Sequence, residues 1–129
     1  MLAQFAAVGI GAALGAWLRW GLGLALNATL PPLPLGTLAA NLIGGLAMGV
    51  VMELVERHAW LSHEARLFLA TGLLGGLTTF SSFSAEASAL LLHGEWLWGA
   101  ALVLAHVAGS ILLTLAGLWI VRAAFATLA

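Results

Sequence analysis

Four long apolar runs divide the sequence, and short polar stretches separate them. The runs cover approximately residues 3–26, 36–56, 65–92 and 95–124. Each is long enough for a helix to cross a hydrocarbon core of roughly 30 Å, which takes about 20 residues. The pattern predicts an all-α membrane protein with four transmembrane helices. We expect residues 1–129 to form a single transmembrane domain.

The third run is too long, and too polar at its centre, for one uninterrupted span. A continuous helix over residues 65–92 would be about 42 Å long, and the stretch from Gly72 to Ser84 holds three glycines and five hydroxyl residues. Because Gly and Thr both favour departure from a helix, we expect a break in mid-membrane near residues 75–79. Protein or a water-filled cavity must then satisfy the freed backbone groups. This stretch is therefore the candidate functional site.

The break suits ions of either sign. Carbonyl oxygens at the end of the first half-helix suit a cation, as in transporters with broken helices. Hydroxyl donors and the ring edges of Phe80 and Phe83 suit an anion, because the edge of an aromatic ring is its positive part. Ordinary core packing is the alternative for the two rings. Glu86, about two turns beyond the break, is interpreted as a proton site, a pore-mouth carboxylate or a paired charge.

The first two spans carry informative polar and small residues. Arg19 lies between two tryptophans, so it is either an interfacial anchor or a buried cation that attracts an anion or holds a loop in place. Asn41 shares a helical face with Thr37 and needs a partner in the apolar depth, either as glue between helices or as part of a pathway. Gly-x-x-x-Gly patterns at residues 11–15 and 45–49 predict faces where another helix approaches closely.

The fourth span carries a single polar stripe. His106, Ser110 and Thr114 recur at positions i, i+4 and i+8 of an otherwise apolar run, so they share one helical face. Taken singly, each is typical of a side chain that bonds its own backbone or joins helices. Together on one face, they indicate the wall of a pathway.

Composition narrows the class of protein. The chain is 63% hydrophobic and 7% charged with a net charge of −1, and a soluble surface needs far more charge than this. The charge balance gives no support for a nucleic-acid partner. Cysteine is absent, which excludes disulfides and thiolate chemistry.

The charged cluster between Glu53 and Arg66 is interpreted as a solvated loop with helix-end charges, with Trp60 at the interface. No clean ligand spacing within it favours a metal site. Arg57, Arg66 and Arg122 lie on the side of the two termini, and a single arginine leans to the other side. This mild bias favours cytoplasmic termini, and so few charges leave both orientations open.

Three motifs together resemble the Fluc (CrcB) family of fluoride channels. They are Gly11-x-x-x-Gly15-Ala16-x-x-Arg19, Gly36-Thr37-Leu38-x-x-Asn41-x-x-Gly44 and Gly75-Gly76-Leu77-Thr78-Thr79-Phe80-Ser81-Ser82-Phe83. The resemblance extends over all four spans, and the third motif is one that composition does not produce easily. Two positions depart from the family pattern: Ser82 stands where Thr is frequent, and His106 stands where an aromatic such as Tyr is common.

The resemblance implies passive fluoride efflux across the plasma membrane (the inner membrane of the cell). It further implies an antiparallel, dual-topology homodimer in lipid, with two pores along the subunit interface. Backbone carbonyls of Gly75 and Thr78 from both subunits would hold a central structural Na⁺, and ring edges of Phe80 and Phe83 would face fluoride. The implied ion pathway comprises Asn41, Thr79, Phe80, Phe83, Glu86, His106, Ser110 and Thr114, and the implied structural or vestibule residues are Arg19 and Thr37.

Three other classes of protein compete with this interpretation. A proton-coupled exporter of the small multidrug resistance type is the main alternative. It needs a deep carboxylate, usually in the first span, and here the first span has no acid, leaving Glu86 as the candidate. A non-transporting assembly subunit would not explain polar stripes on three spans. No Gly-x-Ser-x-Gly elbow accompanies the Ser and His residues, so we expect no enzyme activity.

Overall fold

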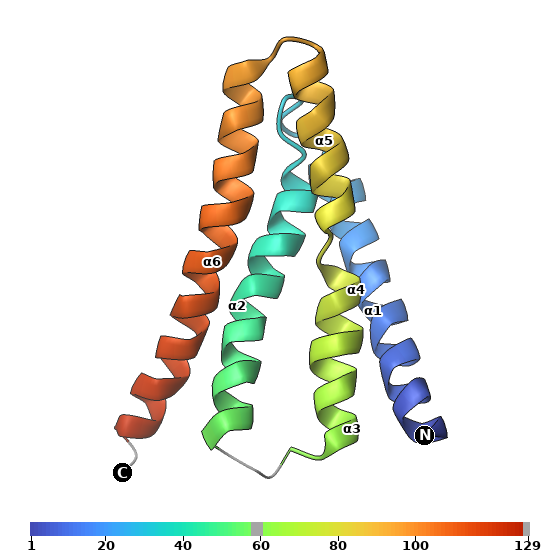
Figure 1. The fold of residues 1–129 in the computed structure, drawn as a ribbon, viewed down its shortest axis with the longest axis vertical. Coiled ribbons are helices and arrows are strands. Elements are labelled where there is room, and N and C mark those ends of the chain that lie inside the picture. Colours follow the sequence, from blue (N-terminus) through green and yellow to red (C-terminus); the bar gives the residue numbers. More distant parts are fainter. Residues whose placement is uncertain (58–60, 128–129) are drawn as a thin grey trace.

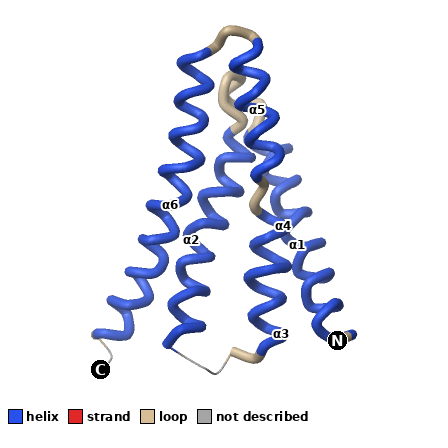
Figure 2. Tube along the Cα trace, in the orientation of Figure 1, coloured by secondary structure: helices blue, strands red, loops and turns tan. Residues whose placement is uncertain are grey.

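The structure, a computed structural model, describes residues 1–57 and 61–127, and every regular element within them is a helix (Figures 1 and 2). The elements are α1 (Leu2–Leu26), α2 (Leu35–Arg57), α3 (His63–Arg66), the π-helix η1 (Leu67–Leu74), α4 (Gly75–Leu77), α5 (Phe80–Leu92) and α6 (Trp96–Ala126). Four segments are long and apolar enough to cross a membrane, with α3 to α5 forming one of them. The predicted four-span, all-α architecture is confirmed. His58 and Trp60, expected in a solvated loop and at the interface, lie outside the described residues.

The four segments run alternately along one bundle, and both termini lie at the same end (Figure 1). A proline-containing loop joins α1 to α2. Within it, the Asn27 side-chain oxygen accepts hydrogen bonds from the N–H groups of Gly36 (2.8 Å) and Thr37 (3.2 Å). These bonds satisfy two N–H groups in the first turn of α2, which have no partner within the helix itself. Asn27 thereby fixes the start of α2.

Small residues let α1 lie directly on the third segment. A Cβ atom added at Gly11 or Gly15 would collide with the backbone of η1, and one added at Gly76 of α4 would collide with the backbone of Ala12. Such close backbone contact is what small residues allow between membrane helices. The face predicted at residues 11–15 is therefore the one that α1 presents to η1 and α4.

Glycines also allow α2 and α6 to pack closely against each other. A Cβ atom added at Gly49 would meet the carbonyl oxygen of Thr114, and one added at Gly117 would meet the carbonyl oxygen of Leu46. The two helices therefore touch backbone to backbone over several turns. This contact places the polar stripe of α6 beside the polar face of α2.

The third segment breaks at two residues rather than five. Thr78 (φ −81°, ψ 153°) and Thr79 (φ −150°, ψ 115°) are extended, whereas Gly75 and Gly76 remain helical in α4, contrary to the expected break over residues 75–79. A glycine stands at position 76 because α1 passes too close for any side chain there, and not because the helix breaks at this residue. The π-helix η1, which precedes α4, was not predicted from the sequence.

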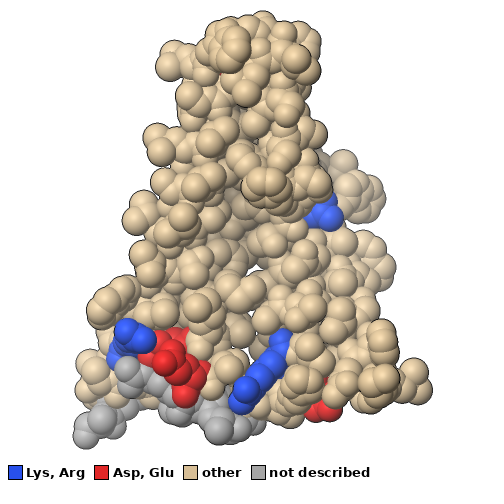
Figure 3. Space-filling model, viewed as in Figure 1, with Lys and Arg blue, Asp and Glu red and all other residues tan. Residues whose placement is uncertain are grey.

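The charges at the terminal end are more buried than expected. Glu53 is 1% exposed, and the Nε atom of Arg122 donates to its carboxylate at 2.9 Å. The prediction that Glu53 belongs to a solvated cluster was therefore wrong, because a cation on α6 reaches it inside the bundle. The charged side chains visible in Figure 3 lie mainly at this end of the molecule.

We predict that Gly15→Ala lowers the free energy of unfolding by about 1–3 kcal/mol, since its Cβ has no room against η1. Gly9→Ala on the same helix is the matched control, because its Cβ meets nothing within 4 Å. Alanine forms helix better than glycine, so the control should be neutral or stabilising by up to about 1 kcal/mol. Denaturation with SDS in mixed micelles, followed by circular dichroism, measures both. Equal effects of the two variants would contradict the close packing of α1.

Candidate functional site

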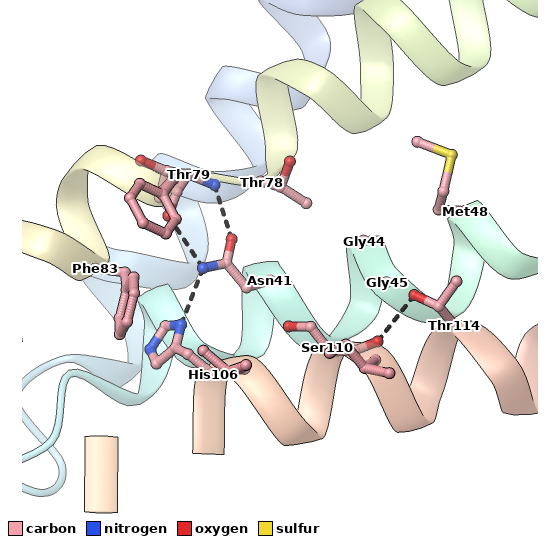
Figure 4. A pocket seen from close by; sticks show the side chains of 13 residues that line it. Asn41, Gly44, Gly45, Met48, Thr78, Thr79, Phe83, His106, Ser110 and Thr114 are labelled. Carbon is pink, nitrogen blue, oxygen red and sulfur yellow. Dashed lines mark hydrogen bonds between the residues drawn. The ribbon is translucent and has the colours of Figure 1, made fainter. Parts of the chain in front are cut away.

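A cavity of about 410 Å³ lies between α2, the break and α6, and we call it the central groove (Figure 4). Its walls come from four elements of the chain, and none of the lining residues is an acid, a lysine or an arginine. They are Asn41, Gly44, Gly45, Met48, Thr78, Thr79, Phe80, Phe83, His106, Val107, Ser110, Ile111 and Thr114. The groove therefore offers amide, hydroxyl and ring-edge contacts without a carboxylate.

Asn41 bridges the break. Its Oδ1 atom accepts a hydrogen bond from the N–H of Thr79 at 2.7 Å, and its Nδ2 atom donates to the carbonyl of Thr79 at 3.1 Å. The same Nδ2 atom lies 3.0 Å from Nδ1 of His106 (Figure 4). A carboxamide has two N–H donors, so both are engaged within the protein. The backbone of the broken segment is therefore the partner that the sequence predicted for this amide, which is partly buried.

The carbonyl groups of Gly75 and Thr78 are among those that lose their helical donors at the break. In an uninterrupted helix, the carbonyls of Gly75 and Thr78 would accept from the N–H groups of Thr79 and Ser82. Here the Thr79 N–H donates to Asn41, and the Ser82 N–H donates to the Thr79 hydroxyl at 3.1 Å. That hydroxyl is the N-cap of α5. The break therefore leaves these two backbone oxygens without the donors that a helix would give them.

Arg19 is tied to the same region from the outside. Its Nε atom donates to the carbonyl of Gly76 at 3.1 Å, and the side chain is partly buried. The neighbouring Trp17 and Trp20 are 66% and 67% exposed. Arg19 therefore holds the end of α4, a helix and not a loop, and the two tryptophans are exposed on the surface of the chain.

The aromatic side chains form a short stack along one wall. The rings of Phe80 and Phe83 meet edge to face, with centroids 5.4 Å apart and planes inclined by 67°. Phe83 is buried and stacks on His106 at 4.7 Å, whereas Phe80 is 77% exposed. In an edge-to-face pair the positive edge of one ring meets the face of the other, and both rings line the central groove.

The polar stripe of α6 meets α2 at its glycines. The Thr114 hydroxyl donates to the carbonyl of Ser110 at 2.8 Å, as one of the sequence interpretations expected. A Cβ atom added at Gly45 would touch Ser110 and Thr114. The glycine therefore keeps this part of the groove open beside the two hydroxyl residues.

Three predicted residues lie in a second cavity of about 380 Å³, which we call the side cavity. Arg19, Thr37 and Glu86 line it, and Thr79 lines both cavities. The Thr37 hydroxyl donates to Oε1 of Glu86 at 2.6 Å, and Oε2 is buried without a hydrogen-bond partner among the described residues. Glu86 is thus a paired group away from the central groove.

Sequence reasoning did not single out Asn27, which also lines the side cavity. Its Oδ1 atom accepts hydrogen bonds from the N–H groups of Gly36 and Thr37 and so fixes the first turn of α2. The available signal was an asparagine at the end of the first apolar run, four residues before Pro31, where its side chain is free to bond to a neighbouring turn.

The chain is similar to known proteins over most of its length. Residues 6–118 match the model of the family described as CrcB-like protein, Camphor Resistance (CrcB). A protein of Thiobacillus denitrificans named fluoride-specific ion channel FluC is 58% identical over 113 residues, which are 88% of this chain and 91% of that protein. The FluC proteins of Ralstonia pickettii and Nitrosospira multiformis are 55% and 53% identical, over 92% and 90% of this chain and 94% and 91% of their own lengths.

We predict that Asn41→Leu destabilises the backbone of the break at Thr79. Without the carboxamide, the Thr79 N–H and carbonyl lose their partners, and each unsatisfied group costs about 1–3 kcal/mol. Hydrogen–deuterium exchange in lipid nanodiscs should show the Thr79 amide exchanging faster by at least about tenfold, since about 1.4 kcal/mol of lost protection gives that factor. Ser110→Ala is the control, because it removes a hydroxyl from the same groove without touching the break. Unchanged protection of Thr79 in Asn41→Leu would contradict the bridge.

Proposed function

The chain belongs to the CrcB-like protein family, a family of multi-pass proteins of the cell membrane, and we propose that it is a fluoride-selective channel rather than an enzyme. It would allow fluoride to leave the cell passively, which protects the cell. The observation that carries the proposal is the central groove, whose wall of hydroxyl groups, an amide and ring edges carries no carboxylate. Relatives named fluoride-specific ion channels support the identity of the ion.

The groove chemistry suits a small, strongly hydrated anion. An anion in a narrow dry passage must exchange its water for donors of short reach, because burying an unpaired charge is very unfavourable. The Ser110 hydroxyl and the edges of Phe80 and Phe83 would be such contacts, whereas the Thr79 hydroxyl already donates to Oγ of Ser82 at 3.1 Å. Each is individually weak, and weak contacts in series allow an ion to leave as well as enter.

In this proposal Asn41 has no free N–H group that it could donate to fluoride. Both of its N–H groups already bond within the protein, one to Thr79 and one to His106. The Thr114 hydroxyl is likewise bonded, to its own helix. Fluoride at either residue would have to exchange for one of these bonds. Glu86, Thr37 and Arg19, in the side cavity, would form the vestibule through which the ion reaches the groove.

An antiparallel homodimer would complete the passage. The central groove is open along one face of the bundle, and the Phe80 ring beside it is 77% exposed. A second copy laid against this face would bury the ring and give the groove its missing wall. Because a twofold-symmetric interface uses the same surface of both copies, each copy would contribute one groove, and the single interface would contain two pores.

A structural Na⁺ fits the backbone of the break. The carbonyls of Gly75 and Thr78 have lost their helical donors to other partners, and hard cations take oxygen ligands. We propose that these two oxygens hold Na⁺ together with their copies in the second subunit. When bound, the ion supplies a fixed positive charge, which offsets the electrostatic penalty of an anion in a medium of low dielectric constant.

We predict that liposomes containing the purified protein release fluoride faster than chloride by about 100-fold or more. A barrier difference of about 2.7 kcal/mol is enough for that ratio, and the groove favours the anion that its short-reach donors can surround. Ion-selective electrodes measure both rates under matched gradients, with protein-free liposomes as the blank. Equal release rates for fluoride and chloride would contradict the proposal that the channel is selective for fluoride.

We predict that Phe80→Ile with Phe83→Ile reduces fluoride release to the rate of protein-free liposomes, because aliphatic side chains present no positive edge. Phe5→Ile is the matched control, since that ring lies on α1 and is 73% exposed. Elution volume and circular dichroism verify that the double variant keeps the size and helicity of the unaltered protein. If a folded double variant conducts fluoride as fast as the unaltered protein, the two rings serve only ordinary core packing.

A further inference from the structure

His106 occupies the centre of the bundle and contacts two residues of the site. Its side chain is 4% exposed, its ring stacks on Phe83, and its Nδ1 atom faces the carboxamide of Asn41 at 3.0 Å. The ring therefore adds a titratable group to a groove that otherwise holds neutral side chains.

The neighbours of Asn41 determine which nitrogen of the imidazole carries the proton. The Thr79 N–H can only donate and the Thr79 carbonyl can only accept, so Oδ1 and Nδ2 of Asn41 cannot be exchanged. Nδ2 therefore points an N–H at His106, and the Nδ1 atom of the ring must accept it. A neutral imidazole that accepts at Nδ1 carries its proton on Nε2.

We propose that His106 is a positioning residue for Asn41 and performs this role only as the neutral, Nε2-protonated ring. Its lone pair at Nδ1 fixes one N–H of the carboxamide, and the rest of the carboxamide fastens Thr79 at the break. The proposal rests on the proposed channel function for its effect on flux. The Nε2–H is buried without a hydrogen-bond partner among the described residues, so it remains a donor for a water or a passing anion.

Protonation of the ring would undo this arrangement. An imidazolium has N–H groups at both positions, so the Nδ1–H would face an Asn41 N–H across the present 3.0 Å. The carboxamide would turn away, and Thr79 would lose its bridge. A fixed positive charge in the groove would also hold an anion too tightly for rapid release. Both effects lower throughput as the pH falls.

The surroundings of the ring contain few other charges. Among the described residues, α5 contributes Glu86, one turn beyond Phe83, and its carboxylate bonds to Thr37. The acids of α2 lie three or more turns beyond Asn41, where Glu53 pairs with Arg122 of α6. Arg19 of α1 bonds to the backbone of α4. His106 is therefore the titratable group that bears directly on Asn41.

Solid-state ¹⁵N NMR of histidine-labelled protein in lipid tests the protonation state without any assay of transport. His106→Asn identifies the resonances of residue 106 by their loss. At pH 8 we expect a ring with an unprotonated Nδ1 and a protonated Nε2. The opposite tautomer, or an imidazolium at that pH, would overturn the proposal.

Fluoride release from liposomes between about pH 8 and pH 5 tests the consequence, because this range spans histidine titration. We expect release through the unaltered protein to fall severalfold, with the blank subtracted at each pH. His106→Asn keeps an acceptor near the Nδ1 position and does not titrate, so it should conduct with little dependence on pH. His93→Asn, at an exposed ring at the end of α5, should retain the profile of the unaltered protein.

A flat profile in the unaltered protein, or the same acid loss in His106→Asn, would overturn the proposal. So would an NMR spectrum in which the ring stays neutral at a pH where flux has fallen. Should no fluoride pass at any pH, the proposed channel function fails instead, and the tautomer alone decides whether His106 positions Asn41.

Discussion

Backbone groups that leave a helix at membrane depth must find partners inside the protein, and one carboxamide provides two of those partners here. Asn41 accepts from the N–H of Thr79 and donates to its carbonyl, which replaces the helical pattern at the point where it fails. The side chain comes from a different helix, so the break is fixed in space relative to α2.

The break also lies where the third segment changes neighbours. Its first half, η1 and α4, packs on α1 through glycines that allow backbone contact. Its second half, α5, packs on α6, where Phe83, Ala87 and Leu102 form a buried cluster. A single straight helix would have to satisfy both neighbours along one axis. Two half-helices joined by extended residues meet each neighbour separately, and the central groove lies at the junction (Figure 1).

Local pattern predicted those features that depend on local sequence. Apolar length gave the four spans, and small-residue spacing gave the face of α1 that packs on η1. The two glycines of the break were misread because glycine has two uses, and only the position of α1 reveals that Gly76 serves close approach. The π-helix has no signature in residue type, since it depends on how the segment is accommodated between its neighbours.

Long-range pairings could not be predicted from one sequence. The sequence indicated that Asn41 needs a partner, but the choice of Thr79 and His106 depends on contacts 38 and 65 residues away. Glu53 was assigned to solvent because its neighbours in the chain are charged. Its actual environment depends on Arg122, which is 69 residues away in sequence.

The two chemistries that the sequence left open at the break do not exclude each other. A helix ends in carbonyl oxygens with partial negative charge and begins in N–H groups with partial positive charge. Because only Thr78 and Thr79 separate α4 from α5, both kinds of terminus lie within one turn of each other. A cation suits the carbonyl end, where Arg19 already bonds to Gly76. An anion suits the beginning of α5, where the Thr79 hydroxyl and the first N–H groups gather. A broken helix therefore supplies paired sites of opposite sign from backbone alone, and an uncharged groove can attract an anion without a basic side chain in its wall.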